Sequence, residues 1–147
     1  MPRRELTIPC TAIAVGADAA GDDAPLLREI ATAYDKLGDV QGHPTVANLG
    51  DTSAALANYR LAEEIRTRLS ALDPTNPDCR REQALSFDKI GDLLQSQGDH
   101  KAALENYSRS LVIRLELGDA DSSNELFQTN VAASHDRIGT LLLGMGN

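Results

Sequence analysis

A short charged segment occurs three times in this chain of 147 residues, as ATAYDKLGD (31–39), ALSFDKIGD (84–92) and AASHDRIGT (132–140). Each copy places an acidic and a basic side chain next to each other, and the first two copies add a second aspartate. Such groups can hold a basic or polar ligand, or can pair with one another between packed helices. Both interpretations stay open. The residues concerned are Asp35, Lys36, Asp39, Asp88, Lys89, Asp92, Asp136 and Arg137, together with Gln95, which follows the second copy by three residues.

Residue types that serve in catalysis are present, but not in catalytic patterns. The three histidines, His43, His100 and His135, have no Cys or carboxylate at the spacing of a metal site. The sequence contains no nucleophilic serine motif and none of the phosphate-binding or catalytic motifs of protein kinases. We therefore expect a protein that is not an enzyme and that uses no cofactor and no metal.

The two cysteines, Cys10 and Cys79, are far apart in the sequence and lie outside any Cys-x-x-Cys pattern. This arrangement predicts two free thiols in a reducing compartment, so we expect a cytoplasmic protein. A disulfide between them is the alternative.

Charge and composition limit the class of partner. The net charge is -8 and aromatic residues make up 3% of the chain. An acidic protein of this kind is a poor ligand for nucleic acid or for an anionic membrane, both of which require clustered Lys and Arg. A basic or polar protein or peptide is the expected partner.

Residues 1–24 form the least regular part of the sequence. Arg3 and Arg4 precede an apolar run, as in a signal peptide, but Glu5 and Pro9 interrupt the pattern. We predict a disordered or linker-like leader, with secretion as the alternative. No apolar run approaches the roughly 20 residues that a membrane-spanning helix needs.

From residue 25 onward, apolar residues recur at helical spacing and predict an all-α domain of about five helices. Their buried faces are expected to include Leu26, Leu85, Leu115 and Leu126. The first helix should end near Val40 and the fourth at Gly118. The predicted N-caps are Asp22 or Asp23, Asp51 or Thr52, Thr75 in a capping box with Asp78, Asp99, and Ser122 in a capping box with Glu125.

The repeat has a period of 48 residues, the distance from Gly50 to Gly98 and from Gly98 to Gly146. Gly38 and Gly91 lie 53 residues apart, so the first unit carries five extra residues between Gly38 and Gly50. The resulting organisation is a domain at 25–147 with units at about 25–74 and 75–121 and a half unit at 122–147.

Glycine inside a helix costs about 1 kcal/mol relative to alanine, and each copy of the repeated segment contains one: Gly38, Gly91 and Gly139. Close approach of a neighbouring helix is the expected compensation. Tyr59 and Tyr107, also 48 residues apart, should fill the space between paired helices as core residues.

This pattern resembles the tetratricopeptide repeat (TPR) family, in which an aromatic and a Leu-Gly pair mark the first helix and an Ala four residues before an aromatic marks the second. The matching residues are Phe87, Ile90, Gly91, Leu94, Ala103 and Tyr107, with Tyr34, Leu37, Gly38, Ala55 and Tyr59 in the first unit. The resemblance implies an α-solenoid of antiparallel helix pairs that acts as a protein-interaction module. It also implies that the repeated charged residues line a concave groove formed by the first helices.

The segment VQGHP (40–44) is similar to the insertion in TPR tails that follow bacterial Ser/Thr protein kinase domains. A regulatory or oligomerisation tail derived from such a kinase is therefore the alternative function. The last residues are apolar, with Leu141, Leu142, Leu143 and Met145. This apolar end predicts a homodimer through the C-terminal helix, with a truncated member of a longer repeat array as the alternative.

Overall fold

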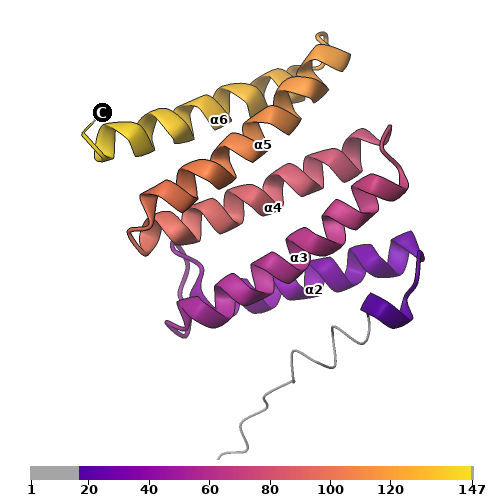
Figure 1. Ribbon diagram of the computed structural model, residues 1–147, viewed down its shortest axis with the longest axis horizontal. Helices are drawn as coiled ribbons and strands as arrows, with labels where there is room; N and C mark the ends of the chain where they lie inside the picture. The colour runs from indigo at the N-terminus through magenta and orange to yellow at the C-terminus, as the bar shows by residue number, and fades with distance from the viewer. Residues whose placement is uncertain (1–16, 147) are drawn as a thin grey trace, which may run out of the picture.

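The computed structural model describes residues 17–146, and every extended regular element in that range is an α-helix (Figure 1). A short helical turn at 17–19 precedes α2. The all-α prediction is confirmed. The helices are α2 (Ala24–Gly42), α3 (Thr52–Leu72), α4 (Pro77–Ser96), α5 (His100–Ala120) and α6 (Glu125–Gly144).

Successive helices run in opposite directions and form a row, with α2 near one end and α6 at the other (Figure 1). Each helix packs mainly against its neighbours in the chain, so α4 contacts α3 on one side and α5 on the other. Cys10 and most of the predicted leader lie outside the described residues, whereas Ala17 and Ala20 pack against the apolar cluster of α2 and α3. Cys79 is a buried free thiol.

Polar side chains cap the start of every helix. The carboxylates of Asp23, Asp51 and Asp99 accept hydrogen bonds from backbone N–H groups of the first turn, which confirms these three caps. The two predicted capping boxes are wrong: Asn76 and Asn124 cap α4 and α6 instead. Each of these asparagines directly precedes its helix, and its side-chain oxygen accepts from two backbone N–H groups there.

Two helices are longer than predicted. Helix α2 continues past Val40 to Gly42, because the following loop returns and donates backbone hydrogen bonds to the carbonyl groups of Val40 and Gln41. Helix α5 continues past Gly118 to Ala120. Gly118 is buried, and a Cβ atom there would lie 3.3 Å from the amide nitrogen of Gln128 on α6, so this glycine permits close packing and does not end the helix.

Glycine and tyrosine make the same contact in both complete units. A Cβ atom on Gly38 would lie 2.5 Å from Cε1 of Tyr59, and a Cβ atom on Gly91 would lie 2.5 Å from Cε1 of Tyr107. Both tyrosines are 1% exposed, which confirms their predicted place in the core. The predicted close approach of a neighbouring helix is therefore present at these two glycines, and it is a tyrosine ring that fills the space.

Four leucines predicted for the buried faces are exposed. Leu26, Leu85, Leu115 and Leu126 keep 40%, 42%, 39% and 54% of their surface exposed. A helix that packs against its neighbours in the row leaves the rest of its surface open to solvent, and α6, at the end of the row, packs mainly against α5 alone.

Candidate partner-binding face

Buried ion pairs join the two helices of each unit. Nη1 of Arg66 on α3 lies 2.6 Å from Oδ2 of Asp35 on α2, and Nη2 of Arg114 on α5 lies 2.5 Å from Oδ2 of Asp88 on α4. All four residues are at most 8% exposed. The repeated aspartate therefore faces the second helix of its own unit.

The same arginines also reach the next unit. Nη1 of Arg66 donates to the hydroxyl of Ser86 on α4, at 2.8 Å, and Nη1 of Arg114 donates to the hydroxyl of Ser134 on α6, at 2.6 Å. Each guanidinium thus connects three helices through its fixed fork of donors. Burial raises the pKa of the Asp88 carboxyl above its ordinary value, against the opposing effect of the positive charges of Arg114 and Arg137.

A second, half-buried polar cluster repeats beside each ion pair. In the first, the hydroxyl of Tyr59 donates to Oδ1 of Asp39 at 2.7 Å, and Nζ of Lys89 lies 3.0 Å from the same oxygen. Nζ of Lys89 also lies 5.3 Å from the centre of the Tyr59 ring, within the range of a cation–π contact.

The second half-buried cluster has the same plan. The hydroxyl of Tyr107 donates to Oδ1 of Asp92 at 2.7 Å and also lies 2.8 Å from Oε1 of Gln95. Nη1 of Arg137 donates to Oδ1 of Asp92 at 2.7 Å. Lys89 and Arg137 each come from the unit that follows, so the clusters join consecutive units.

These contacts shift the acidity of their members. Burial by itself would raise the pKa of Asp39, but hydrogen bonds from Tyr59 and Lys89 and the charge of Lys89 outweigh it and hold this pKa below its usual value. Burial, together with the neighbouring aspartates, raises the pKa of Tyr59 and of Tyr107. Both phenols therefore act as hydrogen-bond donors at neutral pH.

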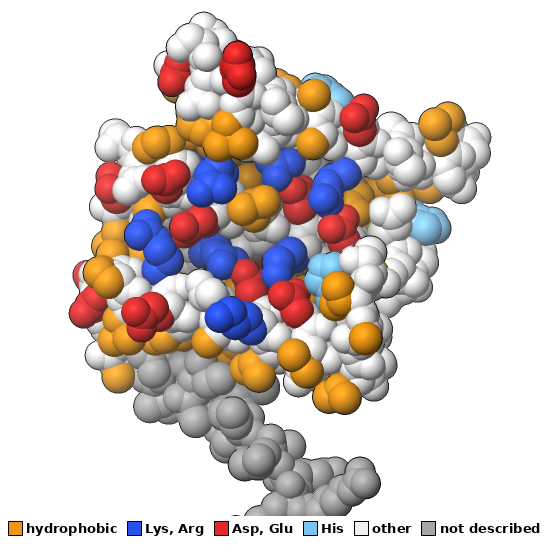
Figure 2. All heavy atoms as spheres, turned by 180° about the vertical axis from the view of Figure 1, so that it is seen from behind, with side chains coloured by type: hydrophobic (Ala, Val, Ile, Leu, Met, Phe, Trp, Pro, Cys, Tyr) orange, Lys and Arg blue, Asp and Glu red, His pale blue; other side chains and the backbone are white. Residues whose placement is uncertain are grey.

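A small hollow of about 190 Å³ lies where these groups meet on α4. Acidic and basic side chains line it in equal number, and the exposed Leu85 forms its apolar part. Figure 2 shows the face opposite to that of Figure 1, where Lys and Arg side chains are interspersed with Asp and Glu across the middle. The residues lining the hollow are Asp35, Arg66, Glu82, Leu85, Asp88, Lys89 and Arg137.

The structure brings together only part of the predicted set of site residues. Asp35, Asp88, Lys89 and Arg137 line the hollow, although Asp35 and Asp88 are buried and bound to arginines. Asp39, Asp92 and Gln95 lie in the half-buried clusters.

Two predicted residues lie away from the hollow. Lys36 is exposed and borders a shallow depression on α2, beside Arg28 and Glu29. Asp136 is exposed on α6. Six of the nine predicted residues, by contrast, form ion pairs between helices: Asp35, Asp39, Asp88, Lys89, Asp92 and Arg137.

The sequence-based prediction of site residues did not include Arg66 and Arg114. Each follows its tyrosine by seven residues, and each is preceded by an isoleucine, as Ile65 and Ile113. An arginine that recurs beside a buried apolar residue was the available signal, because a charge at such a position needs a partner. The sequence-based prediction placed Leu85 on a buried helix face because leucine is apolar, so it did not identify Leu85 as a surface residue.

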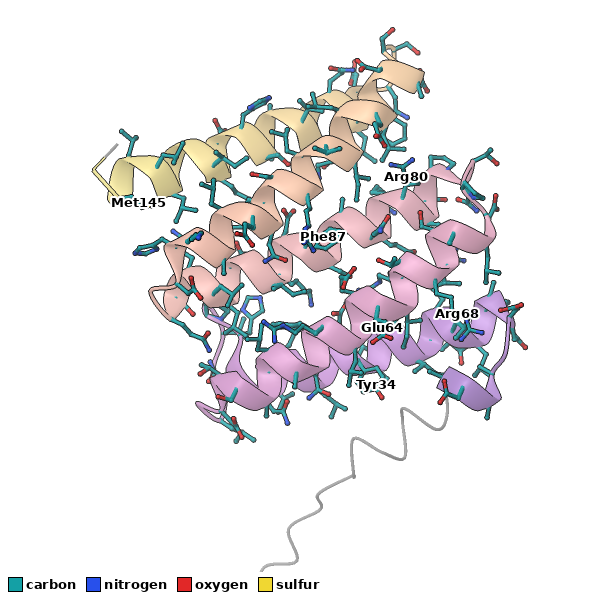
Figure 3. The ribbon with its side chains drawn as sticks, viewed as in Figure 1. Tyr34, Glu64, Arg68, Arg80, Phe87 and Met145 are labelled. Atoms are coloured by element: carbon teal, nitrogen blue, oxygen red, sulfur yellow. The ribbon has the colours of Figure 1, made fainter. Side chains whose placement is uncertain are left out.

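Another hollow, of about 300 Å³, lies near the start of the chain, where Ala17 and Asp18 approach α2 and α3. Figure 3 labels Tyr34, Glu64 and Arg68 in its wall. None of the residues predicted for partner binding lines it. Across residues 17–146, no group of three or more His, Cys, Asp or Glu side chains is placed to hold a metal ion. The helices in the same range are all too short or too polar to cross a membrane.

Comparison of the sequence with protein-family models gave no match, and comparisons with curated proteins and with solved structures gave none either.

Proposed function

We propose that this chain is a TPR-like, non-catalytic interaction module that binds a peptide or a partner helix over the hollow on α4. The observation that carries the proposal is the convergence of charged side chains from four helices around one exposed leucine, Leu85. An exposed apolar side chain ringed by polar groups is the usual composition of a small recognition site.

The charges around the hollow narrow the kind of partner. Three acidic residues and three basic residues line it, so the site has no excess of either sign. A polar peptide that places one apolar side chain against Leu85 fits this composition better than a strongly basic peptide. The ion pairs between helices hold the surrounding side chains in place before binding, which lowers the entropy that binding must overcome.

The test uses peptides selected from a random library on the full wild-type chain, with their affinities then measured by calorimetry. Leu85→Glu places a charge in the centre of the hollow on an already exposed position and should weaken binding at least about tenfold. Leu115→Glu is the matched control, because Leu115 on α5 is exposed to a similar extent, at 39%, and does not line the hollow. Peptides that bind Leu85→Glu as tightly as the wild type would contradict the proposal, as would a selection that enriches no peptide.

A further inference from the structure

Where α4 packs against α5, the repeated segment of α4 contacts two side chains of α5. Gly91 leaves room for the ring of Tyr107, whose Cε1 lies only 2.5 Å from where a Cβ atom would stand. Three residues before this glycine, Asp88 binds Arg114 at 2.5 Å. The first helix of a unit therefore offers two receptors on one face, one for an aromatic ring and one for a guanidinium group.

Helix α6 carries the third copy of this segment, and its receptors are open. Gly139 corresponds to Gly91, but apart from its chain neighbours and the nearby backbone of α6 itself, no atom of the described residues lies within 4 Å of where its Cβ atom would stand. Asp136 corresponds to Asp88, but it is exposed and forms no ion pair with any residue of 17–146. Leu143, on the same face of α6, is 77% exposed. This face is distinct from the hollow on α4.

The spacing of the two receptors defines what can occupy them. Tyr59 and Arg66 on α3, and Tyr107 and Arg114 on α5, are each seven residues apart. Seven residues make about two helical turns, so both side chains project from one face of a helix. A helix with an aromatic residue followed seven residues later by an arginine can fill both receptors at once.

The third copy differs from the second in the residues that would surround the hydroxyl of a bound tyrosine. In the second unit this hydroxyl lies within hydrogen-bond distance of Asp92 and Gln95. Thr140 and Leu143 stand at the corresponding positions of α6. Because the carboxylate is replaced by a smaller hydroxyl and the amide by an apolar side chain, phenylalanine suits this receptor at least as well as tyrosine.

We propose that the face of α6 formed by Asp136, Gly139 and Leu143 binds a helix of another protein that carries Phe or Tyr and, seven residues later, Arg. A folded second copy of this chain does not offer such a helix. Its Tyr59–Arg66 and Tyr107–Arg114 pairs are already buried against its own α2 and α4. The proposed occupant is therefore not a folded second copy of this chain, and charge complementarity with Asp136 selects its arginine.

The experiment titrates the full chain with a synthetic peptide that copies residues 99–120, which carry Tyr107 and Arg114, and measures binding by calorimetry. We expect saturable binding to the wild type. Gly139→Ala and Asp136→Asn should each weaken it at least about tenfold, and circular dichroism should show that both variants remain folded. Asp119→Asn is the matched control, because Asp119 is an exposed aspartate on α5 and its variant should bind normally.

Variants of the peptide test the chemistry of each receptor. Tyr107→Phe in the peptide should bind at least as tightly as the parent, whereas Arg114→Met should bind more weakly. The loss from Arg114→Met should nearly vanish when the chain carries Asp136→Asn, because the two changes remove the same contact. Failure of the parent peptide to bind, or binding that Gly139→Ala leaves intact, would overturn the proposal. A dimer of the chain alone that Gly139→Ala dissociates would also overturn it, since the occupant would then be a second copy.

Discussion

Arg114 on α5 and Asp88 on α4 form an ion pair that water scarcely reaches, since the two residues are 5% and 4% exposed. A charge in such a place is stable only while its partner is present, because removal of one partner leaves the other buried without compensation. The pair is also repeated by Arg66 and Asp35 in the first unit. Each pair therefore links the first helix of its unit to the second.

Arg114→Met should lower the free energy of unfolding by about 3–5 kcal/mol near neutral pH. The change leaves the Asp88 carboxylate buried without a counter-charge, so its pKa, which burial already raises, rises further. A raised pKa in the folded state means that the folded protein holds the proton more tightly than the unfolded chain does. The variant should accordingly recover stability relative to the wild type as the pH falls from about 7 towards the ordinary pKa of aspartate, about 4.

Urea titrations of both proteins across this pH range provide the measurement. Arg60→Met, which changes an exposed arginine on α3, is the control and should have little effect on stability at any pH. A stability loss in Arg114→Met that is the same at pH 7 and at pH 4 would contradict the assigned role of Asp88.

Gly91→Ala and Gly139→Ala should change stability in opposite directions, although the two glycines correspond in the repeat. A Cβ atom on residue 91 meets the ring of Tyr107, and such overpacking costs about 1–3 kcal/mol. Apart from the nearby backbone of α6 itself and the chain neighbours, a Cβ atom on residue 139 meets no atom of the described residues, so the better helix propensity of alanine should stabilise α6 by up to about 1 kcal/mol. Thermal melts of the two variants measure both changes in stability. Changes of the same sign would show that the contact with the tyrosine ring does not determine the effect of the substitution.

Tyr107→Phe should lower stability by about 1.5–3 kcal/mol, the range for a hydrogen bond to a charged group, because its hydroxyl donates to the Asp92 carboxylate. A double-mutant cycle with Asp92→Asn isolates this contact by denaturant titration. A coupling energy near zero would mean that the hydroxyl and the carboxylate do not interact in solution.

Asp39 should contribute stability that disappears in acid. Its pKa is held below the ordinary value in the folded state, so the folded protein binds fewer protons here than the unfolded chain does. The stabilisation is complete above the ordinary pKa of aspartate, about 3.9, and is lost as the pH falls through the lower folded value.

Asp39→Asn removes this contribution, so the stability difference from the wild type should shrink as the pH is lowered from about 6 to about 3. Urea titration at a series of pH values measures the difference, with Asp119→Asn as the control for loss of one negative charge. A difference that grows in acid would have the wrong sign for a carboxylate with a lowered pKa.

The sequence by itself determined the class of the fold, the 48-residue period and three of the five helix caps. The fold class and the caps depend on local preferences, namely apolar residues at helical spacing and aspartates before helices. The period follows from comparing segments of the sequence with one another, which needs no knowledge of how the helices pack. The glycines inside helices also predicted close contact with a neighbouring helix. Gly38 and Gly91 confirm this prediction, whereas at Gly139 it is wrong among the described residues.

Only the tertiary structure decided which charged residues are buried. Asp88 and Asp136 occupy the same position in the repeat, yet one is 4% exposed and bound to Arg114 and the other is exposed. The difference arises because α5 covers α4, whereas none of the described residues covers the corresponding face of α6. The environment of a charged side chain is set by the helix that packs on it, and for Asp88 that helix supplies its arginine from 26 residues further along the chain.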